Sequence, residues 1–229
     1  MKILCVIAAR GGSKGIPSKN IRMINGKPLI SYAIESAVSS NCFDKIVVST
    51  DDKKIATIAK TSGASVPFYR PSHLAQDDSA PDDAILHCLH ELAHQNETFD
   101  IVVLRDCTVP FIDEIDIQNS LKLFSENSCD VVAFSIKAHP NPYFGMMEPD
   151  KDGCLIPSKN VSSDICRRQD SPIVYDVDGM FILDVKNFLK TKKIFSGKII
   201  PFEISKEHGH MIDFEFDFKV AELLMKAKS

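Results

Sequence analysis

The order of apolar and amphipathic segments constrains the fold of this chain more than any other feature of its sequence. Short apolar runs bounded by turn residues alternate with helical segments, beginning with an apolar run at 3–8, a helical pattern after Pro28 and a second apolar run at 45–50. Such alternation is typical of a mostly parallel sheet with helices on both faces. We therefore predict a Rossmann-like three-layer α/β/α domain.

Further apolar runs predict the remaining strands, and apolar residues spaced three and four apart predict the remaining helices. The expected strands are 65–68, 100–105, 130–135, 173–183 and 199–203. The expected helices are a short one after 51–52 that ends at Gly63, then 82–95, 113–126 and a closing helix around 218–225.

The 229 residues fit one domain, 1–229, which is long enough to bury a core without disulfides. One stretch, about 139–172, departs from the alternation: it contains five prolines and shows no sustained period. Stretches of this length without regular elements inside a compact domain are usually functional. We expect this segment to be an inserted arm that packs on another subunit.

Composition excludes several classes of protein. A net charge of −4 gives no electrostatic footprint for binding nucleic acid. The seven cysteines are odd in number and form no Cys-x-x-Cys pair, which favours reduced thiols in the cytosol. No apolar stretch suggests export or a membrane span, so we expect a cytoplasmic protein.

The loop at 9–20 follows the first expected strand and contains three glycines together with Arg10, Lys14 and Lys19. Glycines let backbone amides turn toward a ligand, and the cations can neutralise a polyphosphate. A loop in this position lies at the carboxyl edge of the sheet, where α/β proteins bind ligands. The loop therefore predicts a phosphate site, although a solvated polar turn is the alternative interpretation.

The loop matches neither the dinucleotide fingerprint nor the P-loop, since the chain contains no G-x-G-x-x-G and no correctly spaced Gly-Lys-Ser/Thr. It instead resembles, as A-R-G-G-S-K-G-I-P-S-K-N followed by G-K-P-L-I, the signature of the acylneuraminate cytidylyltransferases, or CMP-sialic acid synthetases. The likeness is strongest to legionaminic-acid members. It continues in V-V-S-T-D-D at 47–52, V-P-F-Y-R-P at 66–71, L-A-Q-D at 74–77 and I-D-F-E-F-D-F at 212–218.

This resemblance implies a nucleotidyltransferase domain with a dimerisation arm, in which the anomeric hydroxyl of a nine-carbon 2-keto sugar acid attacks the α-phosphorus of CTP with the help of Mg²⁺. The implied catalytic residues are Arg10, Lys14, Lys19 and Asp213. The implied nucleotide-binding residues are Ala8, Arg10, Gly12, Ser13, Asn20, Arg70, Ser79 and Asp106. The resemblance leaves open whether Asp213 or a bound water takes the hydroxyl proton.

Many family members carry two metal-binding aspartates near the C-terminus, whereas this chain has Met211 and Asp213 in those places. A thioether is a poor ligand for Mg²⁺. Related ketodeoxyoctonate enzymes use an aspartate after the fourth strand, where this chain has Asp106. We therefore predict that Asp106 and Asp213 share the metal ion, with a turn-capping role for Asp106 as the alternative.

On the acceptor side, Arg168 aligns with an arginine that family members bring toward the sugar carboxylate, often from the partner subunit. A solvated pair with Arg167 is the alternative. The resemblance also implies a homodimer, with a higher assembly left open, and a segment at 141–144 favours a legionaminic-type acceptor. Pseudaminic acid and an eight-carbon ulosonate stay open as acceptors, and Met211 motivates a non-catalytic nucleotide-binding protein as a second hypothesis.

Overall fold

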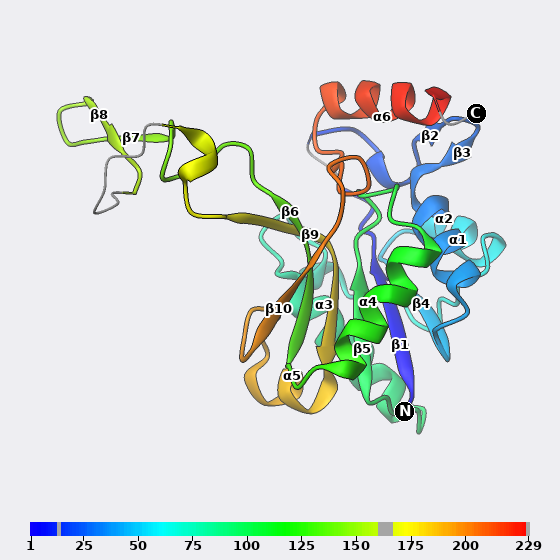
Figure 1. Ribbon diagram of the computed structural model, residues 1–229. Coiled ribbons are helices and arrows are strands. Elements are labelled where there is room, and N and C mark those ends of the chain that lie inside the picture. The colour runs from blue at the N-terminus through cyan, green and yellow to red at the C-terminus, as the bar shows by residue number, and fades with distance from the viewer. Residues whose placement is uncertain (13–14, 160–166, 228–229) are drawn as a thin grey trace.

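A computed structural model describes residues 1–12, 15–159 and 167–227 of the chain (Figure 1). Its main sheet has six strands in the order β10-β6-β9-β5-β1-β4. The strands are β1 (Ile3–Ala8), β4 (Lys45–Ser49), β5 (Ile101–Arg105), β6 (Val131–Lys137), β9 (Tyr175–Asp184) and β10 (Ile199–Glu203). The β1–β4, β1–β5 and β6–β10 pairs are parallel, whereas β9 runs antiparallel to both of its neighbours. The prediction of a mostly parallel sheet is confirmed.

Helices cover both faces of this sheet. The helices of the described residues are α1 (Leu29–Ser40), α2 (Lys53–Thr61), α3 (Pro81–His94), α4 (Glu114–Glu126), α5 (Val185–Thr191) and α6 (Glu215–Ala227), and the first five lie on these faces. Alternate side chains of β1 point to opposite faces: Leu4 and Val6 pack with α3 and α5, while Cys5 and Ile7 pack with α1 and α2. The predicted three-layer α/β/α arrangement is therefore confirmed.

The sixth helix lies at one end of the sheet instead of on a face (Figure 1). Phe218 and Ala221 of α6 pack on Ile16, Ile24 and neighbouring residues of the segment after β1. That segment contains η1 (Lys19–Ile21) and the small β2–β3 hairpin (Met23–Ile24 and Lys27–Pro28). The last helix thus covers the loop that the sequence assigned to phosphate binding.

One expected strand is absent, and one helix was not expected. Residues 65–68 form no strand, because only Ser65 bridges to Val47 before Pro67, which has no N–H to donate, and the chain turns away through η2 (Ser72–Leu74). The helix that was not expected is α5. This helix begins immediately after β9, where the Asp184 side chain accepts a hydrogen bond from the Asn187 amide as an N-cap.

The arm leaves the sheet from the ends of β6 and β9 and extends well away from the rest of the molecule (Figure 1). It carries the β7–β8 hairpin (Met147–Pro149 and Leu155–Pro157) and η3 (Arg168–Asp170). Large apolar side chains on it are exposed, including Met147, Leu155 and Ile156. None of the helices in the described part of the chain is long and apolar enough to cross a bilayer.

Candidate active site

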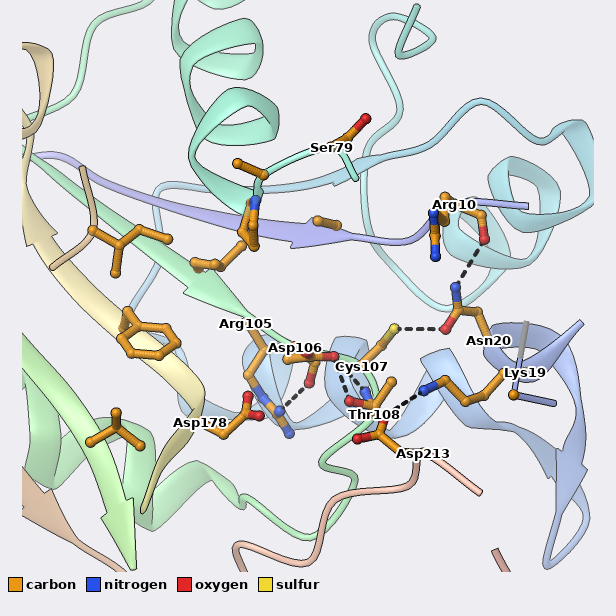
Figure 2. A pocket seen from close by; sticks show the side chains of 18 of the residues that line it. Arg10, Lys19, Asn20, Ser79, Arg105, Asp106, Cys107, Thr108, Asp178 and Asp213 are labelled. Carbon is orange, nitrogen blue, oxygen red and sulfur yellow. Dashed lines mark hydrogen bonds and ion pairs between the residues drawn. The ribbon is translucent and has the colours of Figure 1, made fainter. Parts of the chain in front are cut away.

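A cavity of about 640 Å³ opens at the carboxyl edge of β1 and β5 (Figure 2). It is lined by eight of the residues proposed from the sequence: Ala8, Arg10, Lys19, Asn20, Arg70, Ser79, Asp106 and Asp213. Gly12 is exposed and is not among the residues that line the cavity. Ser13 and Lys14 lie outside the described residues. The structure therefore brings together side chains from the first loop, the 70–80 segment, the end of β5 and the segment before α6.

Two cations of the first loop, Arg10 and Lys19, line the cavity, and each of them faces a carboxylate. Arg10 Nη1 lies 2.9 Å from Asp77 Oδ1. Lys19 Nζ donates hydrogen bonds to the Ile212 carbonyl at 2.7 Å and to Asp213 Oδ1 at 3.0 Å. Asp77 is in the position of a counter-ion that an incoming anionic ligand can replace.

Buried polar contacts hold the part of the cavity that is lined by Arg70 and Asn20. Arg70 is buried and donates from Nη2 to the Ser49 carbonyl at 2.9 Å, and burial lowers the pKa of its guanidinium. The Asn20 amide donates to the Arg10 carbonyl at 3.0 Å and accepts from the Cys107 thiol at 3.2 Å. Burial raises the pKa of that thiol to about 12, so Cys107 serves as a neutral donor.

The first loop and the segment before α6 also touch through their backbones. A Cβ atom at Gly15 would lie 2.5 Å from the carbonyl oxygen of Asp213, closer than real side chains approach. Glycine is therefore required here by close contact, and this contact keeps Lys19 beside Asp213.

Three carboxylates lie close together in the cavity: Asp106, Asp178 and Asp213, the last of them next to Lys19 (Figure 2). Asp106 Oδ1 accepts hydrogen bonds from the amide and the hydroxyl of Thr108, both at 2.8 Å. Asp106 therefore does cap a turn, as the alternative interpretation expected. Both of these bonds end on Oδ1, so Oδ2 can still coordinate a cation.

Asp178 was missed by the sequence analysis. It lies near the start of β9. If β9 ran parallel to its neighbours, this position would lie at the edge of the sheet opposite the cavity. The antiparallel direction of β9 brings it to the ligand edge instead, where the neighbouring Gly179 accepts a hydrogen bond from the Asp106 amide at 2.8 Å. Burial, and then the charges of Asp106 and Asp213, raise the pKa of Asp178 to about 6.

This elevated pKa predicts a pH-dependent stability. Ionised Asp178 destabilises the folded protein, because its pKa is raised from 3.8 to about 6. The penalty is complete above about pH 6 and vanishes below about pH 4. Asp178→Asn should therefore stabilise the metal-free protein at pH 7.5 by about 3 kcal/mol.

Thermal unfolding between pH 4 and pH 8 tests this expectation. The gain in melting temperature should shrink as the pH falls. Asp176→Asn is the control, because Asp176 is an exposed carboxylate on the same strand and its substitution should change stability little. A gain from Asp178→Asn that stays constant over the whole pH range would contradict the prediction.

An apolar wall completes the cavity on the side of β9. It consists of Leu104, Val177, Phe181, Ile194 and Phe195. The Phe181 and Phe195 rings pack edge to face with centroids 5.5 Å apart, and Phe195 remains 60% exposed. Residues 194 and 195 follow α5, so the sequence analysis, which lacked this helix, had no reason to place them at the site.

Arg168 lies on the arm and is not among the residues that line the cavity of its own chain. It donates to the His139 carbonyl, and its guanidinium carbon lies 5.4 Å from the centre of the Phe144 ring. Arg167 forms an exposed ion pair with Asp170. The role of Arg168 toward the acceptor therefore stays a prediction that requires a second subunit.

The described residues contain another group of possible metal ligands: Asp113, Asp116 and His208. Asp113 and Asp116 form a capping box at the start of α4, and His208 Nδ1 lies 2.6 Å from Asp116 Oδ2. These contacts explain why the three side chains lie together: they cap the start of α4. Met211, in the place of the missing metal aspartate, packs against the apolar cluster beneath α4.

The fold and the cavity together define an α/β nucleotidyltransferase. The chain belongs to the cytidylyltransferase family, whose model matches residues 4–221. It is 36% identical to post-translational flagellin modification protein B of Campylobacter coli and 33% identical to CMP-N,N'-diacetyllegionaminic acid synthase of Campylobacter jejuni, in both cases over 100% of this chain and 97% of the relative. The solved structure of CMP:2-keto-3-deoxy-manno-octonic acid synthetase complexed with CTP shares the fold, with a TM-score of 0.73 and 15% identity over the whole of both chains.

Proposed function

We propose that this protein is a CMP-nonulosonate synthetase, which joins CTP and a nine-carbon 2-keto sugar acid of the legionaminic or sialic type to give the CMP-sugar and pyrophosphate. One observation carries the proposal: cations, carboxylates and an apolar wall line a single cavity at the ligand edge of the sheet. The name of the diacetyllegionaminic relative, which aligns over the whole chain, supports this class of acceptor.

Different lining residues of the cavity bind different parts of the two substrates. Arg10 and Lys19 bind the triphosphate, with Lys14 expected to join them, while Arg70, Ser79 and Asn20 hold the nucleoside. The apolar wall with Phe181 and Phe195 receives the methyl groups of the acceptor's N-acyl substituents, because apolar groups prefer surroundings without water.

The reaction is a displacement at phosphorus. The anomeric hydroxyl oxygen forms a bond to the α-phosphorus while the bond from this phosphorus to the bridging oxygen breaks and pyrophosphate leaves. The hydroxyl proton passes to Asp213 or to a bound water. Such a displacement depends on alignment and charge neutralisation more than on a covalent protein nucleophile. Arg10 and Lys19 supply cationic groups where charge develops on the leaving pyrophosphate.

The carboxylates fit a divalent cation. Asp106 Oδ2 and the Asp213 carboxylate are hard oxygen donors on the side of the cavity that faces the phosphate loop, and this is the chemistry that Mg²⁺ prefers. Bound there, Mg²⁺ would polarise the α-phosphate and offset its charge. Asp106 and Asp213 are therefore proposed as the metal-binding residues, and Asp106 also as a neighbour of the acceptor.

We also propose that the protein acts as a cytoplasmic homodimer through its arm. The β7–β8 hairpin exposes apolar side chains far from the rest of its own chain, and burying them against a second copy would stabilise both. The dimer would let Arg168 reach the acceptor site of its partner. Sedimentation equilibrium is expected to give about twice the chain mass of 25.4 kDa, and a monomer at micromolar concentration would contradict this.

Pyrophosphate release with CTP, Mg²⁺ and a panel of sugar acids tests the proposed function. The panel contains N,N'-diacetyllegionaminic, N-acetylneuraminic, pseudaminic and ketodeoxyoctonic acids, so that it also ranks the alternative acceptors. Release with a legionaminic or sialic acid is the expected result. Tight CTP binding without release for any acid would favour the non-catalytic alternative.

A further inference from the structure

Arg105 is the last residue of β5 and is completely buried, although its side chain carries a charge. Burial lowers the pKa of its guanidinium to about 10, so it remains positively charged at neutral pH. Burying a charge costs free energy unless its partners compensate. Among the described residues, Arg105 Nε has no hydrogen-bond partner, so the compensation is incomplete.

The guanidinium binds the segment that follows the strand. Nη1 donates to the carbonyl of Asp106, and Nη2 donates to the carbonyls of Val109 and Ile112 at 2.8 and 3.4 Å. One side chain thus fixes three carbonyls of the segment 106–112, which carries Asp106, Cys107 and Thr108 to the cavity (Figure 2). A planar guanidinium can do this because its donors point in fixed, diverging directions.

Asp106 is consequently held from two sides. Thr108 donates two hydrogen bonds to its Oδ1 atom, and Arg105 holds the carbonyl of the same residue. The remaining side-chain oxygen, Oδ2, is thereby fixed relative to the cavity. The charge of Arg105 also lies close to Asp106 on a side of the cavity where Asp178 and Asp213 add further negative charge.

We infer that Arg105 is a positioning residue for cation binding, which orients the Asp106 carboxylate toward the divalent ion and offsets part of the negative charge around it. This inference rests on the proposed function, because it assigns the ion to Asp106. Arg105 is itself one of the residues that line the cavity, and in this role it acts through the residue that follows it.

Arg105→Lys and Arg105→Gln test the inference. Lysine keeps the charge but cannot hold three carbonyls in one plane, and glutamine removes the charge. Arg70→Lys is the matched control, because Arg70 is also buried in the wall of this cavity but binds the Ser49 carbonyl on the nucleotide side.

Three quantities are measured: folding by circular dichroism, binding of Mn²⁺ in the presence of CTP by electron paramagnetic resonance, and kinetics with varied Mg²⁺ and varied CTP. In both Arg105 variants the Mn²⁺ dissociation constant and the half-saturating Mg²⁺ concentration should rise roughly tenfold or more, with a smaller change in the KM for CTP. Arg70→Lys should show the reverse, a higher KM for CTP and nearly unchanged Mn²⁺ binding.

Folded Arg105 variants that bind Mn²⁺ as tightly as the wild type would overturn the inference. Failure of both variants to fold would also overturn it, since Arg105 would then serve the fold alone. Wild-type protein that binds Mn²⁺ and CTP but releases no pyrophosphate with any acid would refute the proposed function and leave the Mn²⁺ comparison intact. Wild-type protein that binds no Mn²⁺ with CTP present would refute the inference itself.

Discussion

Asp106→Asn is expected to lower Mg²⁺-dependent turnover by roughly three orders of magnitude while leaving the protein folded, because a bound metal ion supplies several kcal/mol of charge stabilisation to the transition state. Asparagine has nearly the shape of aspartate, and its carbonyl oxygen can still accept both hydrogen bonds from Thr108. The substitution therefore removes the charge at this position and preserves the turn.

Steady-state pyrophosphate release and thermal unfolding together check this expectation. Asp184→Asn is the control, because Asp184 caps α5 at the opposite end of β9. That variant should lose at most about 1 kcal/mol of stability and keep its activity. An Asp106→Asn enzyme with normal kcat at low Mg²⁺ would exclude Asp106 as a metal ligand and leave it only its turn-capping role.

Lys19→Met is expected to lower kcat/KM for CTP by about 10²–10³, equivalent to the loss of one well-placed electrostatic contact in the transition state. The Lys19 side chain is only 14% exposed and is already fixed by the Ile212 carbonyl and the Asp213 carboxylate. Little reorganisation is therefore needed when phosphate arrives. The variant also loses the contact that fixes Asp213, so its dependence on Mg²⁺ should change as well.

Lys27→Met is the matched control for this measurement. Lys27 pairs with Glu35 through side chains that are about half exposed, and surface ion pairs of this kind contribute about 1 kcal/mol or less. Its kcat/KM should stay within about twofold of the wild-type value. A Lys19→Met enzyme within the same range would show that Lys19 does not contact the triphosphate during catalysis.

The sequence was most informative where local pattern and fold agree. Alternating apolar runs predicted the strands of the sheet. The glycine-rich loop predicted the ligand edge, because a loop that follows the first strand of an α/β sheet lies at the carboxyl edge of that sheet. Arg10 and Lys19 were found in this way. Asn20, Arg70, Ser79 and Asp106 required the family resemblance, since nothing in their local sequence marks them as cavity residues.

The residues that were missed depend on tertiary structure. Asp178 reaches the site only because β9 runs antiparallel, and strand direction is not encoded in a run of apolar residues. Phe195 depends on α5, a helix of seven residues whose apolar period is too short to recognise. Arg105 would be expected at the solvated end of a strand, and only the path of the segment 106–112 over it explains its burial.

The contact between Gly15 and the carbonyl of Asp213 has a consequence for biosynthesis. The loop that leaves the first strand is completed by a segment that is translated almost two hundred residues later, so a chain growing on the ribosome cannot form this contact until residue 213 has been added and has left the exit tunnel.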